Sequence, residues 1–162
     1  MTPDVKRARD VLAELIGLHL AGATHAASLR SFRFGPGEPS DSDFFLHVQC
    51  PSRLEHSGAI VTGDFDWWEP LEESVTENWE PSKGGSLQDK LLQDVLWDSV
   101  STDGSHPIKC LRVISVTVNE LGDICIQLAN VFRLAVFPRA PVKSLGDFFD
   151  AVWKNEHFVW KP

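Results

Sequence analysis

The sequence predicts an α+β fold: a single domain with a curved, mainly antiparallel β-sheet that is partly barrel-like, covered by two or three amphipathic helices. Two observations predict this class. Six or seven segments alternate apolar and polar residues with the period of a strand, and short turn sequences separate them. The length of 162 residues suits one domain, and no repeat or linker divides it. We therefore treat residues 1–162 as one domain.

Residues 1–17 are expected to form an N-terminal helix. Thr2 can cap it, and Pro3 suits its first turn. Apolar residues then recur at helical spacing until Gly17: Val5, Ala8, Val11, Leu12, Leu15 and Ile16. The opposite face is charged, so the helix is expected to dock on the sheet.

Residues 18–63 are expected to form the first strands. Residues 18–34 alternate like a strand, with a bend expected at Gly22. After a loop rich in Gly, Pro, Ser and Asp, residues 44–50 alternate again. Residues 53–63 are expected to form a further strand, centred on Ile60.

Residues 64–85 are expected to form an acidic, tryptophan-rich loop. Between Asp64 and Glu80 the chain has seven carboxylates, three tryptophans and no Lys or Arg. This composition is typical of an exposed binding loop, because tryptophan is common at binding hot spots and carboxylates attract a cationic partner.

Residues 87–99 are expected to form a second amphipathic helix. Ser86 is placed to cap it, with Asp89 at the capping-box position. Its apolar stripe consists of Leu87, Leu91, Leu92, Val95 and Leu96.

Residues 109–138 predict a three-stranded antiparallel meander with one buried face. The apolar positions alternate in each strand, and Gly122, Asp123 and Asn130 supply turn residues. In the expected register the facing pairs are Val118 with Ile124, Val116 with Ile126, Leu128 with Phe132, Ile126 with Leu134 and Ile124 with Val136. Ile114 is expected on the same buried face.

Residues 144–160 are expected to form a C-terminal helix and an edge strand. Ser144 can cap a short helix that contains Leu145, Phe148, Phe149, Val152 and Trp153. Residues 157–160 are expected to form the edge strand, and a homodimer could form through this sheet edge.

The net charge of −8 is concentrated in the middle of the chain. Residues 38–105 contain three Lys or Arg and fifteen Asp or Glu, which is a net charge of −12. This acidity opposes nucleic-acid binding, which needs clustered Lys and Arg, and it favours a basic protein partner or simple solubility.

The sequence also bears on location. It contains no apolar run long enough for a membrane span, and its N-terminus has no features of a secretory signal. The three cysteines have no CxxC spacing and lie in apolar segments, where reduced core residues are expected. We therefore expect a cytoplasmic protein without membrane contact.

The candidate binding residues all come from the acidic loop. They are Asp64, Asp66, Trp67, Trp68, Glu69, Glu72, Glu73 and Trp79. The ordinary alternative is that the tryptophans pack inward while the acids face solvent. Asp64 and Asp66 could likewise hold a hard cation, although a cap on the turn after Gly63 is the simpler interpretation.

No catalytic motif is present, so an enzyme is the minority interpretation and no cofactor is expected. His19, His25 and His47 are weak candidates for a metal site, since neutral imidazoles on neighbouring strands could converge. The alternative is three separate, half-exposed strand histidines. Arg30 and Arg53 could each pair with the acidic loop or bind an anion.

Four pieces of the chain together resemble a group of small uncharacterised bacterial cytosolic proteins, a domain of unknown function similar to immunity proteins. They are LHLAGATHAASLRSFRFG, FFLHVQCPSRLEHSGAIVTGDFDWWEP, VISVTVNELGDICIQLANVFRLAVFPRA and the terminal EHFVW. The shared pattern includes a Leu-His-x-Gln-Cys-Pro strand and a Gly-Asp-x-Asp turn. The resemblance implies a bacterial cytosolic protein without an assigned activity.

These observations leave two functions open. The first is a non-enzymatic protein-binding domain, immunity-like, that neutralises a basic protein through the acidic loop. The second is a small-ligand or metal-binding domain, hydrolytic in one version, that uses the histidines of the sheet.

Overall fold

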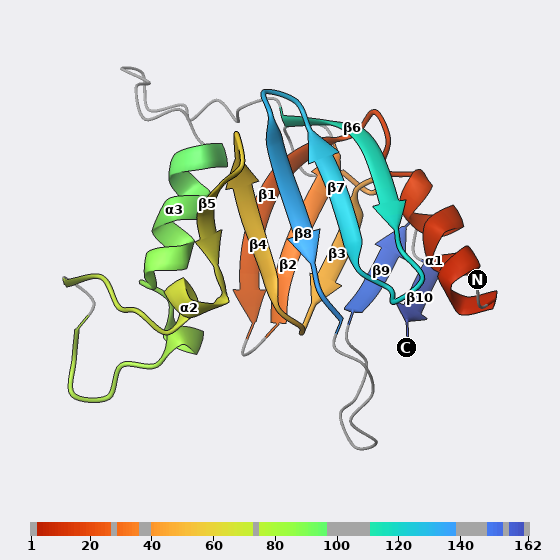
Figure 1. Cartoon of the computed structure of the whole chain (residues 1–162). Coiled ribbons are helices and arrows are strands. Elements are labelled where there is room, and N and C mark those ends of the chain that lie inside the picture. The colour runs from red at the N-terminus through yellow and green to blue at the C-terminus, as the bar shows by residue number, and fades with distance from the viewer. Residues whose placement is uncertain are drawn as a thin grey trace.

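The computed structural model describes residues 3–26, 29–35, 40–72, 75–96, 111–138, 149–153 and 156–160. Three α-helices and ten strands follow one another along these segments (Figure 1). In chain order they are α1 (Pro3–Ala13), β1 (His19–Ala26), β2 (Leu29–Gly35), β3 (Phe44–Val48), β4 (Ser52–His56), β5 (Ala59–Gly63), α2 (Asp64–Trp67), the 3₁₀ turn η2 (Pro81–Lys83), α3 (Leu87–Leu96), β6 (Leu111–Val118), β7 (Ile124–Leu128), β8 (Phe132–Val136), β9 (Phe149–Trp153) and β10 (Glu156–Trp160).

All ten strands belong to one antiparallel sheet in the order β10-β9-β3-β2-β1-β6-β7-β8-β4-β5. The pairing of β1 with β6 is short, His19 opposite Arg112 and Leu20 opposite Leu111, and it joins two five-stranded halves. The sheet does not close, because β10 and β5 remain as edges. This confirms the predicted α+β class with a curved antiparallel sheet.

The two halves of the sheet face each other across one hydrophobic core. Figure 1 shows β4, β7 and β8 in front of β1, β2 and β3. Phe34 and Phe44 from one half and Leu54 and Ile126 from the other belong to the same buried cluster. The helices contribute to it as predicted, through the apolar faces of α1 and α3: Ala8 and Leu12, and Leu92 and Leu96.

The meander of β6, β7 and β8 has the predicted register. Val118 pairs with Ile124, and Ile126 pairs with both Val116 and Leu134. Ile114 was expected on the buried face and is exposed instead. A β-bulge between Val113 and Ser115 shifts the alternation by one residue, so Val113 is buried and Ile114 turns outward.

Two predicted elements differ from the structure. Residues 18–34 form two strands, β1 and β2, which pair antiparallel, and a β-bulge between Leu20 and Gly22 lies where the bend was predicted. The C-terminal helix is wrong over residues 149–153, which form β9 between β3 and β10; residues 144–148 lie outside the described residues. Strand pairing on both sides overrides the helical spacing of the apolar residues.

The other element boundaries also differ in part: residues 53–63, predicted as one strand, form most of the hairpin of β4 and β5. The N-terminal helix ends at Ala13, and turns lead to Gly17 with a φ of 91°. Helix α3 ends at Leu96 within the described residues. The predicted edge strand is β10, which is one of the two free edges of the sheet.

Candidate functional site

The acidic loop begins with the helical turn α2, which its own two aspartates hold in place. Asp66 Oδ2 accepts hydrogen bonds from Gly63 N at 3.0 Å and Thr62 Oγ1 at 2.8 Å. Asp64 Oδ1 accepts one from Ser52 N at 3.0 Å, which ties α2 to the start of β4. The bond from Gly63 N satisfies the N-cap N–H group of the turn, so Asp66 caps α2, whereas Asp64 joins α2 to β4.

The adjacent tryptophans of α2 face different surroundings. The Trp67 ring is partly buried; it contacts the His25 ring edge-on at 4.8 Å between centroids and lies under the Arg30 guanidinium at 4.7 Å. Trp68 is 70% exposed and Phe65 is 93% exposed. The prediction that the tryptophans lie outside therefore holds for Trp68, whereas the Trp67 ring packs against His25 and Arg30.

The rest of the predicted binding set is divided in the same way. Trp79 is partly buried and donates its indole N–H to Gly84 O at 2.9 Å. Glu69 and Glu72 are exposed to solvent. Glu73 lies outside the described residues.

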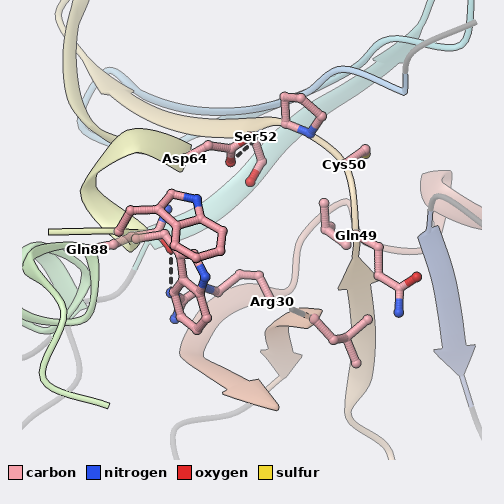
Figure 2. A pocket seen from close by; sticks show the side chains of 11 residues that line it. Arg30, Gln49, Cys50, Ser52, Asp64 and Gln88 are labelled. Atoms are coloured by element: carbon pink, nitrogen blue, oxygen red, sulfur yellow. Dashed lines mark hydrogen bonds between the residues drawn. The ribbon is translucent and has the colours of Figure 1, made fainter. Parts of the chain in front are cut away.

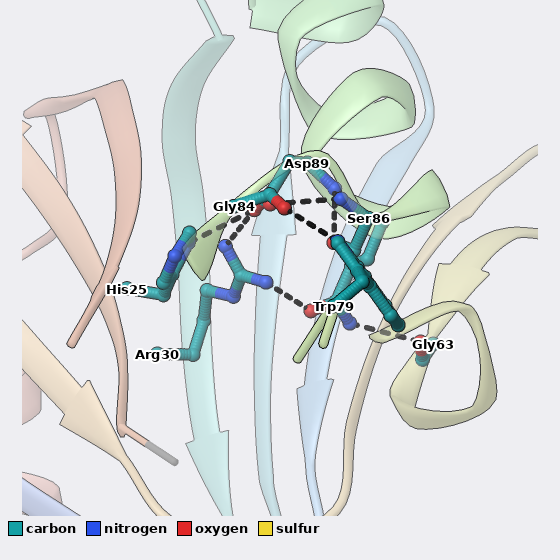
Figure 3. Close-up of polar contacts among 8 residues, drawn as sticks. His25, Arg30, Gly63, Trp79, Gly84, Ser86 and Asp89 are labelled. Carbon is teal, nitrogen blue, oxygen red and sulfur yellow. Dashed lines mark hydrogen bonds and ion pairs between the residues drawn. The ribbon is translucent and has the colours of Figure 1, made fainter. Parts of the chain in front are cut away.

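A polar cluster of His25, Arg30, Gln88 and Asp89 connects β1, β2 and α3 (Figure 3), and its Arg30 guanidinium lies over the Trp67 ring. Arg30, 7% exposed, donates Nη1 to Asp89 Oδ1 at 2.9 Å and Nη2 to Gln88 Oε1. His25 Nδ1 lies 3.1 Å from the same Asp89 oxygen. Asp89 also forms the predicted capping box with Ser86, since Asp89 N donates to Ser86 Oγ at 3.2 Å and Ser86 N to Asp89 Oδ2 at 3.4 Å.

The cluster shifts the acidity of its members. Burial alone would raise the pKa of Asp89, but hydrogen bonds from Arg30 and Ser86 and the positive charge of Arg30 hold that pKa below its usual value. Burial lowers the pKa of Arg30 despite the hydrogen bond and charge of Asp89. Arg30 was predicted to pair with the acidic loop; its partner is instead the capping residue of α3.

A cavity of about 190 Å³, here called the Arg30 cavity, lies between β2, the β3–β4 connection and α2 (Figure 2). It occupies the place where the chain crosses from one half of the sheet to the other. Its lining residues are Leu29, Arg30, Val48, Gln49, Cys50, Pro51, Ser52, Asp64, Trp67, Trp68 and Gln88. Burial raises the pKa of the Cys50 thiol to about 12, so this cysteine is not a thiolate nucleophile near neutral pH.

A second, wider cavity of about 530 Å³, here called the β5 groove, lies on the other side of Trp68. Ile60, Phe65 and Trp68 all line it and are exposed by 63%, 93% and 70%. Pro51, Ser52 and Asp64 line both cavities, so the two hollows adjoin.

The histidines do not converge. His25 belongs to the Asp89 cluster, His19 lies at the opposite end of β1, and His47 stacks on Phe45 with 6.2 Å between ring centroids. Within the part of the chain that the structure describes, no group of three His, Cys, Asp or Glu side chains could hold a metal ion. The predicted histidines therefore form no such group.

Arg53 also pairs differently from the prediction. It donates Nε to Glu55 on its own strand, and Arg133 on β8 donates Nε to Glu55 at 2.8 Å. Burial would raise the pKa of Glu55, but the hydrogen bonds and charges of these two arginines lower it. The group fixes β4 to β8 and does not involve the acidic loop.

Comparisons with known proteins give no match that bears on this site. No protein-family model, curated protein or solved structure matches the chain. Among the described helices, none has the length and apolar character needed to cross a membrane. The resemblance to immunity-like bacterial proteins therefore stays a prediction.

Proposed function

We propose that the chain is a non-enzymatic protein-binding domain and that its contact surface is the β5 groove. The supporting observation is the grouping of Ile60, Phe65 and Trp68, three large apolar side chains, around one hollow with most of their surface in solvent. Single exposed apolar residues are ordinary, whereas a contiguous exposed group is typical of an interaction site.

The charge around the groove favours a cationic partner. Asp64 and Asp66 line it, and Glu69 follows Trp68 directly and is exposed. Between Asp64 and Glu80 the loop contains no Lys or Arg to neutralise them. Such a negative rim accelerates encounter with a basic surface, while Trp68 supplies the central apolar contact.

The edge strand β5 offers a second means of attachment. Among the described strands it pairs with β4 alone and ends the strand order; α3 lies beside it (Figure 1), and Gln88 Nε2 donates to Gly63 O at 2.8 Å at its C-terminal end. An extended segment of a partner can add to such an edge through main-chain hydrogen bonds. A basic protein with an extended segment therefore suits this surface. The resemblance to immunity-like proteins suggests a basic toxin as one such protein.

The test compares two exposed apolar truncations, Trp68→Ala and Leu121→Ala. Leu121 is 78% exposed in the turn between β6 and β7, away from the groove, and serves as the matched control. Proteins captured by the wild-type chain are purified and titrated against all three proteins. For a genuine partner, Trp68→Ala is expected to weaken binding about 30-fold or more, as for a hot-spot residue.

The charge contribution is tested with the Glu69→Gln variant of the same chain. The wild-type affinity is expected to fall as salt rises from about 0.05 to 0.5 M, because screening shortens the reach of surface charges, and Glu69→Gln is expected to reduce this dependence. A captured protein that binds wild type and Trp68→Ala equally, or without salt dependence, would contradict the proposal, as would the absence of any protein that prefers wild type.

Two further expectations accompany this proposal. We retain a cytoplasmic location, which the free thiols of Cys50 and Cys125 support. We also retain self-association through β10, the other free edge of the sheet. Light scattering that gives a monomer mass at millimolar concentration would remove the second expectation.

A further inference from the structure

We infer that the Arg30 cavity is a binding site for a small, uncharged carboxamide. The cavity adjoins the β5 groove and shares Pro51, Ser52, Asp64 and Trp68 with it, but Arg30 lines the cavity and not the groove. The inference therefore goes beyond the proposed function, and its test requires no protein partner.

The size and walls of the cavity suit one small planar group. Its volume is about 190 Å³, and an apolar cavity of about 150 Å³ holds one benzene molecule. Trp67, Trp68 and Pro51 supply the apolar surface, and a few polar side chains converge on the same space. This combination is typical of small-molecule sites.

The donor side of the cavity is formed by Arg30 and Ser52. Two guanidinium nitrogens of Arg30 donate to Asp89 and Gln88, but its Nε is buried without a hydrogen-bond partner among the described residues. An unpaired buried donor costs free energy, so an acceptor atom from a ligand would be stabilised here. Ser52 lines the same cavity and can add its hydroxyl.

The acceptor side is formed by Asp64. Its Oδ1 holds Ser52 N, and the carboxylate lies on the wall that Figure 2 shows beside Ser52 and across from Arg30. A ligand held here should carry an acceptor for Arg30 and N–H donors for Asp64. A carboxamide has one carbonyl oxygen and two N–H donors on one planar group.

The charges exclude the ionised relatives of an amide. Arg30, Asp64 and Asp89 together carry a charge of −1, which disfavours a buried anion. A cation would approach the Arg30 guanidinium, which already covers the Trp67 ring at 4.7 Å. An uncharged group avoids both repulsions.

Three probes with the same ring separate these chemistries. Benzamide is neutral, benzoate is an anion and benzamidine is a cation. Titration followed by tryptophan fluorescence and by calorimetry is expected to give benzamide a dissociation constant at least tenfold lower than either charged probe. A free amide and the side chain of a Gln residue share this chemistry. If N-acetylglutamine methylamide binds more tightly than benzamide, the natural ligand is the Gln side chain of a peptide. If benzamide binds more tightly, the natural ligand is a free amide.

Two conservative variants test the assigned contacts. Ser52→Ala is expected to weaken benzamide binding about three- to tenfold, the effect of one lost hydrogen bond, while the exposed Ser115→Ala on β6 leaves it unchanged. Asp64→Asn keeps an acceptor for Ser52 N and removes the charge, so it should reduce the preference for benzamide over benzoate. Three outcomes would each overturn the inference, whatever the partner titration gives for Trp68→Ala. They are binding curves that do not saturate for any amide, equal affinity for the three ring probes, and benzamide binding that neither Ser52→Ala nor Asp64→Asn affects.

Discussion

Asp89→Asn is expected to destabilise the protein far more than Asp94→Asn, although both residues lie on α3 and both form an ion pair. Asp89 pairs with Arg30, whose side chain is almost fully buried. Asp94 pairs with Lys90 one helical turn away, where both side chains are exposed. The two substitutions therefore make the same chemical change and differ mainly in the burial of the charge left behind.

The magnitude follows from the contacts. Removal of one partner from a buried ion pair costs about 3–5 kcal/mol, because the other charge remains desolvated. The lower end, about 3 kcal/mol, applies to Asp89→Asn, because Gln88 Oε1 still accepts from Arg30 and the new amide oxygen keeps one acceptor. An exposed i,i+4 pair contributes about 0.3–0.5 kcal/mol.

The assay is equilibrium unfolding in urea, followed by far-UV circular dichroism at neutral pH. With a slope of about 2 kcal/mol per molar urea, the midpoint should fall by about 1.5 M for Asp89→Asn and by no more than about 0.25 M for Asp94→Asn. A difference below about 1 kcal/mol between the two variants would refute the assignment of Asp89 as the counter-charge of a buried arginine.

Three further outcomes are expected. The free energy of unfolding should be constant above the ordinary pKa values of 3.8 for Asp and 4.5 for Glu and should fall at lower pH. The reason is that Asp43, Glu55 and Asp89 have lowered pKa values in the folded state, so the unfolded chain binds protons first as the pH falls. Urea midpoints measured across pH 2–6 test this, and a flat profile would contradict it. Gly35→Ala should cost about 2 kcal/mol or more in the same urea assay, because the new Cβ would lie 2.1 Å from Oδ1 of the buried Asp43; an unchanged midpoint would show that the carboxylate moves freely. Val131→Gly should raise the melting temperature, because Val131 has a φ of 63°, which costs a β-branched residue about 1 kcal/mol or more; a lower melting temperature would show that the turn does not constrain this residue.

The local parts of the fold could be predicted from the sequence, and the contacts between distant segments could not. The meander register followed from alternation, since a slip by one residue would expose its apolar face. The capping box of Ser86 and Asp89 followed from spacing alone. The bulge that exposes Ile114 and the strand β9 left no such local signal, because each depends on pairing with a neighbouring strand.

The same distinction explains the candidate site. Arg30 could be recognised as unusual in an otherwise apolar strand, but its partner Asp89 is 59 residues away, and Trp67 reaches it from a third segment. Trp67 and Trp68 are adjacent and have the same sequence context, so the sequence does not show which of them is exposed. Successive residues of a helical turn point in directions about 100° apart, so one tryptophan covers Arg30 and the other faces solvent.

The carboxylates of the protein have two different tasks: some balance arginines within the domain, and others give its surface a negative charge. Asp43, Glu55 and Asp89 are each held by an arginine inside the domain, so their charges are balanced there. Glu69 and Glu72 have no such constraint on their position in solvent and give the surface its negative charge. Because Asp89 holds Arg30 in place, neutralising Glu69 and Glu72 should alter the attraction of a basic partner and leave the amide selectivity of the Arg30 cavity unchanged.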